Sequence, residues 1–297
     1  MPELHGHAEA WSFPLLITSA VALIALAYSR GWFRLRSDSP NRTPAWRVAA
    51  FVSGLFFLWI VVGSGLSAFD HDSLTVHMIN HLILMTVVAP LTLLGAPGRP
   101  LLRGLPAGLE HSAHDFFTRN RQIQPLARVV THPIFCWLFA TATVIGWHIP
   151  AVFNLAMRSH GWHDLEYACF ILAGLLFWLP VVQPATGAHK RLGWSVPVYL
   201  FLATLPCDIL SAFLVFCGRV VYPSYLSADR IFNFSVLEDQ QCAGALMWVW
   251  VTFACLLPAF VITVHMLSPA GFGSQPVGQA SQRVTRQAVS GSHAEVV

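Results

Sequence analysis

The chain has 297 residues, of which 55% are hydrophobic and only 10% are charged, and its mean hydropathy is +0.59. This composition is typical of a membrane protein with several spans and excludes an ordinary soluble domain. The net charge of +3 comes without a basic run or basic residues interleaved with aromatic ones, so we expect no nucleic-acid partner.

Seven apolar runs follow one another along the chain, and we expect each to cross the lipid bilayer as a helix. They are 13–28, 46–69, 74–94, 133–153, 166–182, 196–217 and about 240–266. The sequence therefore predicts an all-α protein, a bundle of seven transmembrane helices. The predicted membrane domain is 13–267, between a tail at 1–12 and a tail at 268–297.

The N-terminal tail carries His and Glu but no Lys or Arg, so we expect a disordered segment rather than a cleavable signal peptide. The C-terminal tail is rich in Gly, Ser and Gln, which also predicts disorder. The six Cys contain no CxxC motif, so no motif of a thiol-based copper carrier or zinc ribbon is present.

Positive charges are distributed unevenly between the loops. Fourteen of the 17 Lys and Arg residues fall in 30–47, 99–128, 190–191 and 283–286, and the other three are Arg158, Arg219 and Arg230. Because cytoplasmic loops of membrane proteins carry the excess of positive charge, this pattern predicts an N-terminus outside and a cytoplasmic C-terminus.

The third run carries His77, His81 and Met85 at spacings that place all three on one face of a helix. Two imidazoles and a thioether on one side of a membrane helix suit copper, and Cu(I) above all, because these are soft ligands. The alternative is that the two histidines only form hydrogen bonds to neighbouring helices. Pro90 is expected to kink this helix near its far end.

In the predicted topology, ionisable residues from several helices reach the outer layer of the membrane together with His77. His148, His163 and Asp239 belong to this layer, as do Asp70 and Glu166, whereas Asp208 lies somewhat deeper. Ionisable groups inside a membrane are costly, so such convergence indicates a metal site at the outer end of the bundle.

Five segments resemble, in this order along the chain, the caa3-type CtaG family of cytochrome c oxidase assembly factors. They are HMINHLILMTVVAPLTLLGAP, THPIFCWLF, WHIPAVFNLA, HDLEYACFILAGLLFWLPVV and LEDQQCAGALMWV. The resemblance does not extend to the first run or the C-terminal tail. It implies a multi-pass, non-enzymatic protein of the bacterial plasma membrane that serves haem-copper oxidase maturation through copper supply, with oxidase subunits as partners.

The positions that match the family pattern are His77, His81, His148, His163, Asp239, Gln240 and Gly244. Position 166 is Glu in a segment where the family often has His, so Glu166 is not assigned as a ligand. The expected metal ligands are therefore His77, His81, Met85, His148, His163 and Asp239, with Cu(I) as the expected ion.

The main alternative is a seven-helix membrane hydrolase with a His-ligated zinc and a catalytic Asp, drawn from His77, His81, His148, Asp208 and Asp239. Met78 stands where an HExxH motif has its general-base Glu, which excludes that type of zinc site. A b-type haem protein that uses His77 or His81 with His148, and a scaffold without any ligand, are the other two alternatives.

Overall fold

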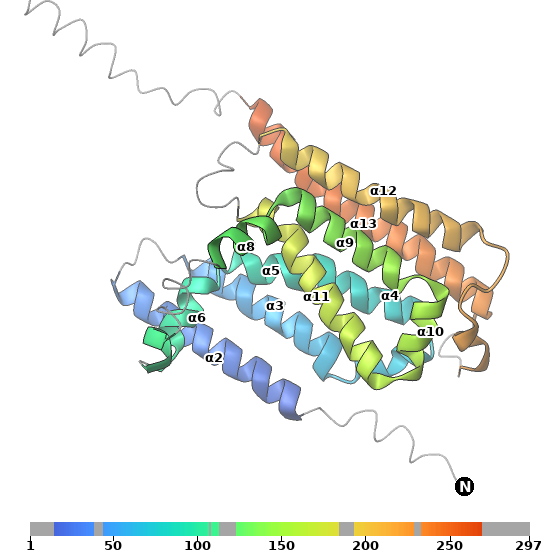
Figure 1. Cartoon of the computed structure of the whole chain (residues 1–297), viewed down its shortest axis with the longest axis horizontal. Helices are drawn as coiled ribbons and strands as arrows, with labels where there is room; N and C mark the ends of the chain where they lie inside the picture. Colours follow the sequence, from blue (N-terminus) through green and yellow to red (C-terminus); the bar gives the residue numbers. More distant parts are fainter. Residues whose placement is uncertain are drawn as a thin grey trace, which may run out of the picture.

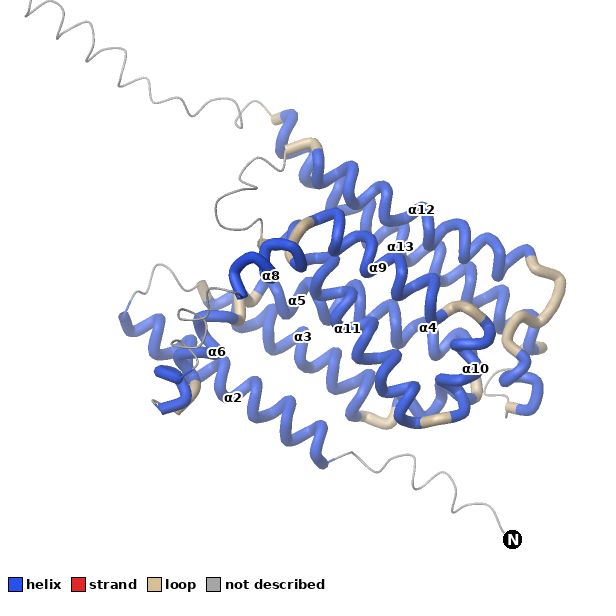
Figure 2. The backbone as a smooth tube through the Cα atoms, viewed as in Figure 1, coloured by secondary structure: helices blue, strands red, loops and turns tan. Residues whose placement is uncertain are grey.

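The computed structural model describes residues 15–38, 44–106, 108–112, 123–183, 193–228 and 233–268. Within these ranges the regular elements are all helices, as predicted (Figure 2). The predicted tails lie outside the described residues, apart from Ser268.

The bundle begins with α2 (Leu15–Asp38), α3 (Ala45–Gly63) and the 3-10 helix η2 (Leu66–His71). The next span consists of α4 (Leu74–Ile83), the π-helix η3 (Leu84–Val88) and α5 (Ala89–Leu94). After it come α6 (Gly98–Gly104), α8 (Ile123–Val130), α9 (Pro133–Trp147), α10 (Pro150–Arg158), α11 (His160–Val182), α12 (Ser195–Phe216), the 3-10 helix η4 (Pro223–Ser227) and α13 (Val236–Leu267).

Six of the described helical segments are long and apolar enough to cross a membrane: α2, α3, the segment 74–94, α11, α12 and α13. The predicted helix at 133–153 is instead broken, because α9 and α10 meet at an angle of 73°. Pro150 explains the break, since proline disfavours a helical residue before it, and Ile149 is extended with ψ 124°. The pair supplies a seventh span if it is taken as one, and α10 turns across the end of the bundle (Figure 1).

The segment 74–94 contains a widened turn one helical turn before Pro90. The N–H of Ala89 donates to the carbonyl of Leu84, five residues earlier, which is the π-helical pattern. Pro90 has no N–H and its ring crowds the preceding turn, so a wider turn accommodates it without breaking the span. The widened turn carries Met85, whose carbonyl accepts a hydrogen bond from Trp178 Nε1 at 2.9 Å.

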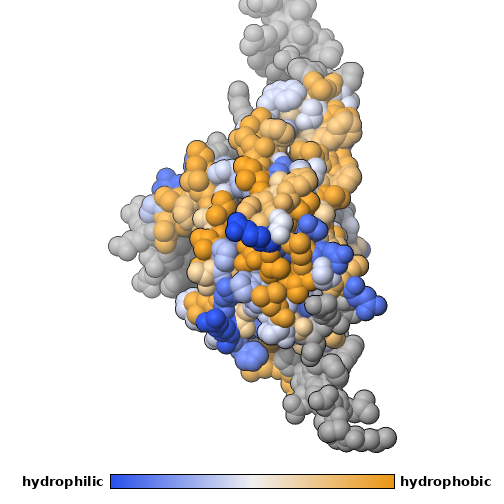
Figure 3. Space-filling view, turned by 90° about the vertical axis from the view of Figure 1, so that its right-hand side faces the viewer, coloured by the Kyte–Doolittle hydropathy of each residue, from blue (hydrophilic) through white to orange (hydrophobic). Residues whose placement is uncertain are grey.

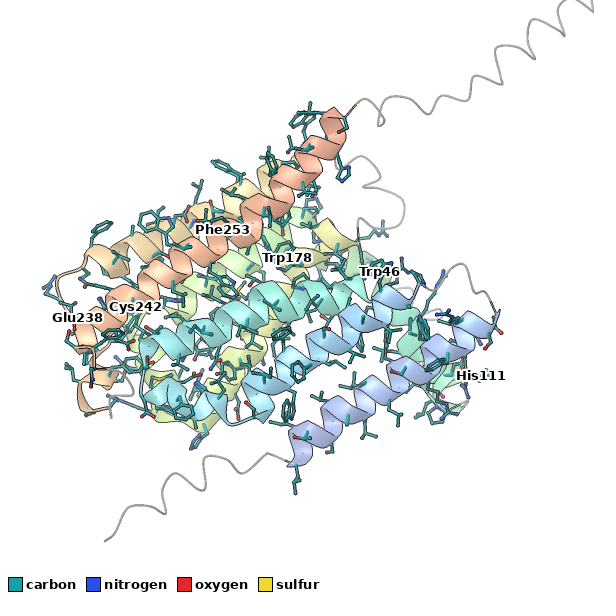
Figure 4. All side chains as sticks on the ribbon, turned by 180° about the vertical axis from the view of Figure 1, so that it is seen from behind. Trp46, His111, Trp178, Glu238, Cys242 and Phe253 are labelled. Carbon is teal, nitrogen blue, oxygen red and sulfur yellow. The ribbon has the colours of Figure 1, made fainter. Side chains whose placement is uncertain are left out.

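The helices pack around the segment 74–94, with α3, α11 and α13 along it, α12 outside against α13 and α9, and α2 at the periphery against α3 and α6 (Figure 1). Large apolar side chains stay exposed along the spans, as a lipid-facing surface requires. The bundle has two distinct ends: Trp46 and His111 lie at one, and Glu238 lies at the other (Figure 4). The candidate site described below lies toward the Glu238 end.

Candidate metal centre

The site begins with a tight connection between α3 and α4. Gly65 has φ 82°, a left-handed conformation that favours glycine, and η2 starts directly after it. The hydroxyl of Ser73 then caps α4 by accepting from the N–H of Val76. This short path turns Asp70 inward, where it is fully buried.

Asp70, His77 and His163 form the first group of potential ligands, drawn from η2, α4 and α11. The Oδ2 atom of Asp70 lies 3.3 Å from His163 Nε2 and 3.6 Å from His77 Nδ1. The carboxylate is held in place by Asn80 Nδ2, which donates to Oδ1 at 2.6 Å, and by the hydroxyl of Tyr167, which donates to Oδ2. These two hydrogen bonds therefore orient the Asp70 carboxylate toward both imidazoles.

His77, His81 and Glu166 form the second group, which shares His77 with the first. Glu166 Oε1 lies 3.5 Å from His77 Nε2 and 3.8 Å from His81 Nε2. The two imidazoles lie on one face of α4, as their spacing of four residues predicts, and both face this carboxylate; the His81 ring also stacks on Phe170. All three side chains are almost completely buried. We call the five residues of the two groups, Asp70, His77, His81, His163 and Glu166, the polar cluster.

Buried polar atoms of the polar cluster lack hydrogen-bond partners among the described residues. These atoms are both ring nitrogens of His77 and of His81, His163 Nε2 and Glu166 Oε2. An unpaired buried polar atom is costly, and a concentration of them in one place is unusual for a folded protein. A cation bound between the imidazoles and the carboxylates would satisfy them together, and this donor set suits a transition-metal ion.

Asp70 carries a negative charge at any ordinary pH. Burial raises the pKa of its carboxyl, but His163, His77 and Tyr167 all face it, outweigh the burial and lower the pKa to about 2. In the next residue, His71, burial lowers the pKa of the imidazole, and the charge of the nearby His163 lowers it further. The site thus combines a permanent carboxylate charge with imidazoles that face it.

Two further predicted ligands, Met85 and His148, lie in neither group. They line a cavity of about 90 Å³ beside the polar cluster, and His81 lines the same cavity. The His148 ring nitrogen Nδ1 lies 2.7 Å from the carbonyl of Val144, while its Nε2 has no hydrogen-bond partner among the described residues.

Asp239, the sixth predicted ligand, also lies outside both groups. Its carboxylate accepts hydrogen bonds at the N-terminus of α4 from Leu74 N at 2.7 Å, Thr75 Oγ1 at 2.6 Å and Ser73 Oγ at 3.0 Å. These contacts give Asp239 a structural task, the attachment of α13 to the start of α4.

Sequence reasoning placed Asp70 and Glu166 in the outer layer but assigned neither of them as a ligand. The sequence contains a signal for Glu166, because this residue follows His163 by three positions and therefore lies on the same face of the helix. Asp70 lies in the short 3-10 helix η2 before α4, and the periodicity of the long apolar runs does not predict the direction of its side chain. Above these residues, the end of the bundle carries hydrophilic patches among hydrophobic ones (Figure 3).

Comparison with known proteins identifies one family and several relatives. The family described as cytochrome c oxidase caa3 assembly factor matches residues 26–268. Uncharacterized proteins of Mycobacterium bovis and Mycobacterium tuberculosis are each 26% identical over 272 residues, and one of Mycobacterium leprae is 25% identical over 273. These alignments cover 90% of this chain but only 40% of each relative. No solved structure matches the chain significantly.

Proposed function

The chain belongs to the cytochrome c oxidase caa3 assembly factor family, and from that membership we propose that it supports haem-copper oxidase maturation by binding copper in the polar cluster. The protein acts in the bacterial plasma membrane, and its partners are oxidase subunits that receive the metal. It assembles another enzyme and catalyses no reaction of its own.

The observation that carries this proposal is the set of buried polar atoms around Glu166 and His77 that have no hydrogen-bond partner among the described residues. Imidazole nitrogens bind copper in either oxidation state, and the carboxylates of Asp70 and Glu166 offset its charge in an apolar setting. When bound, copper would be held by His77, His81 and Glu166, or by His77, His163 and Asp70 on the other side of the same imidazole. His77 offers one ring nitrogen to each group.

The position of the polar cluster suits delivery on the outer side of the membrane. Among the described residues, Arg47 follows Trp46 at the end of the bundle opposite Glu238, so the charge pattern of the sequence and the positive-inside rule favour an outer position for the polar cluster. Copper destined for outward-facing oxidase centres is handled there. The acidic and His-bearing residues at this end would attract the cation.

A second candidate function, a zinc-dependent membrane hydrolase, is favoured by one feature. Two His and one Glu, as in His77, His81 and Glu166, are a donor set used by catalytic zinc sites. Such a protein would cleave its substrate in purified form, and loss of its gene would leave the oxidase intact.

A deletion strain complemented with variants tests the assembly role. Under copper limitation, loss of the gene should lower haem-copper oxidase activity and the copper content of the oxidase, while oxidase transcripts persist. The double variant His77→Ala/His81→Ala should fail to restore activity, although it accumulates in the membrane. The matched control is His160→Ala, because His160 is an exposed histidine outside both groups. Full oxidase activity in the deletion strain would contradict the proposal.

A further inference from the structure

The predicted ligands separate into two neighbouring environments in the folded chain. His77 and His163 lie with carboxylates, whereas Met85 and His148 face the 90 Å³ cavity. We propose that this cavity is a second metal position, selective for a soft monovalent cation and distinct from the polar cluster. The identification of that cation as Cu(I) rests on the proposed function.

Sulfur atoms are concentrated around the cavity. Three of the six methionines of the chain line it, Met78, Met85 and Met247, together with the thiol-bearing Cys207 and Cys255. Methionine alone is an ordinary core residue that fills gaps. Here the thioethers share a cavity with two imidazoles, and thioether with imidazole is the ligand combination that selects Cu(I).

His148 presents a free lone pair to this site. The Val144 carbonyl can only accept a hydrogen bond, so His148 Nδ1 carries the hydrogen at the 2.7 Å contact. The side chain is 7% exposed, and a buried imidazolium whose second N–H had no partner would be costly. The ring is therefore neutral, with an unprotonated Nε2 that is buried and has no partner among the described residues. A backbone hydrogen bond that fixes one ring nitrogen in this way is typical of a metal-ligating histidine.

The charge around the two positions separates their preferred ions. Among the described residues, no Asp or Glu lines the cavity, whereas Asp70 and Glu166 both belong to the polar cluster. A divalent ion loses more hydration energy than a monovalent one on burial and needs negative ligands to offset the loss. The polar cluster therefore favours a divalent cation and the cavity a monovalent one. His81 belongs to both and forms the wall between them.

Two probe ions distinguish the positions in the purified full-length protein. Ag(I) serves as the soft monovalent ion without redox chemistry, and Co(II) serves as the divalent ion with a visible absorption spectrum. Wild-type protein should bind both at once. Met85→Leu/His148→Ala should lower Ag(I) affinity by at least about tenfold and leave Co(II) binding intact. Glu166→Gln should weaken Co(II) binding and leave the Ag(I) affinity intact.

Two further variants control for the loss of a methionine elsewhere in the protein and for misfolding of the His148 variant. Met157→Leu removes a methionine that contacts Tyr225 outside the cavity, so it should change neither ion. Met85→Leu/Met247→Leu nearly preserves side-chain volume and gives a second test if removal of His148 prevents folding. Unchanged Ag(I) affinity in the folded cavity variants, or joint loss of Ag(I) and Co(II) in Glu166→Gln, would overturn the second site. Ag(I) binding that persists while the deletion strain keeps full oxidase activity would instead refute only the assembly role.

Discussion

At the scale of single residues, the carboxylates at this end of the bundle have different tasks. Glu166 and Asp70 face imidazoles, whereas Asp239 accepts hydrogen bonds at the start of α4. The difference follows from the partners: Asp239 meets backbone N–H and hydroxyl donors, whereas Asp70 and Glu166 also face imidazole nitrogens that have no hydrogen-bond partner among the described residues.

Replacing Asp239 by Ala should therefore destabilise the protein without removing the metal. The loss of its charge-assisted hydrogen bonds to Leu74, Thr75 and Ser73 should cost about 1.5–3 kcal/mol, seen as a lower thermal midpoint in detergent. Co(II) stoichiometry should stay at the wild-type value. Asp164→Ala, at an exposed position of α11, is the control and should change neither quantity. Loss of Co(II) from folded Asp239→Ala protein would restore Asp239 as a ligand.

The pH dependence of Co(II) binding should come from the imidazoles. Because an imidazole must be unprotonated to bind the metal, affinity should fall across a titration from about pH 8 to about pH 5 as protons compete with the metal. Because the pKa of Asp70 is lowered to about 2, Asp70 stays charged throughout this range and adds nothing to the slope. Folding lowers the pKa of the Asp70 carboxyl from its unfolded value of about 3.9, so the ionised carboxylate stabilises the fold at pH values above that. This contribution is lost as the pH falls toward about 2.

Asp70→Asn tests this division in the same titration. It should weaken Co(II) binding at every pH, because one negative ligand is gone, while the slope of log affinity against pH stays the same. A flatter slope in the variant would mean that Asp70 itself titrates in this range.

At the scale of elements, the π-helix η3 and α11 approach each other closely at Gly174. A Cβ atom at this position would lie 2.9 Å from the Cα of Met85 and 2.9 Å from the Cβ of Ala89. The absence of a side chain thus lets α11 reach the widened turn that carries Met85. The same contact brings Trp178 within hydrogen-bond distance of that turn.

Gly174→Ala should lower the thermal midpoint and also weaken Ag(I) binding, because the backbone of Met85 must move. Gly146→Ala is the matched control: Gly146 also lies in a helix, but an added Cβ would meet nothing within 4 Å. Since Ala favours helix over Gly by about 1 kcal/mol, Gly146→Ala should be neutral or stabilising. Equal stability of the two variants would contradict the close approach.

At the scale of the whole molecule, the uneven distribution of positive charge predicts how the bundle sits in the membrane. Trp46 and His111, which lie within the Arg-bearing segments 30–47 and 99–128, share one end, and Glu238 lies at the other (Figure 4). The charge pattern therefore assigns each end of the bundle to one side of the membrane.

Reporter fusions test this orientation directly. A reporter that is active only outside the cytoplasm should be silent when fused after Ser268 and active when fused within 221–230, because the first site follows the predicted cytoplasmic end of α13 and the second lies in the predicted outer loop between α12 and α13. The reverse pattern would put the polar cluster on the cytoplasmic side and exclude delivery from outside.

The fold class followed from the sequence, because long apolar runs in a bilayer have almost no structure available other than a helix. The bounds of the segment 74–94 and of α12 were predicted closely for this reason. The break between α9 and α10 was not, although Pro150 marks it, since apolar composition continues through Phe153 while the backbone direction does not.

For the site, the sequence determined that His77 and His81 share a face, because helical periodicity is local. Tertiary packing alone decided their partners. Glu166 joins them from another helix, Asp70 enters from the 3-10 helix η2, and Asp239 instead accepts hydrogen bonds from the free N–H groups at the start of α4. The π turn and the close contact at Gly174 position Met85, which lines a cavity beside the carboxylates together with His148 from the end of α9. These relations depend on the mutual orientation of helices far apart in the chain, which residue spacing within one helix does not encode.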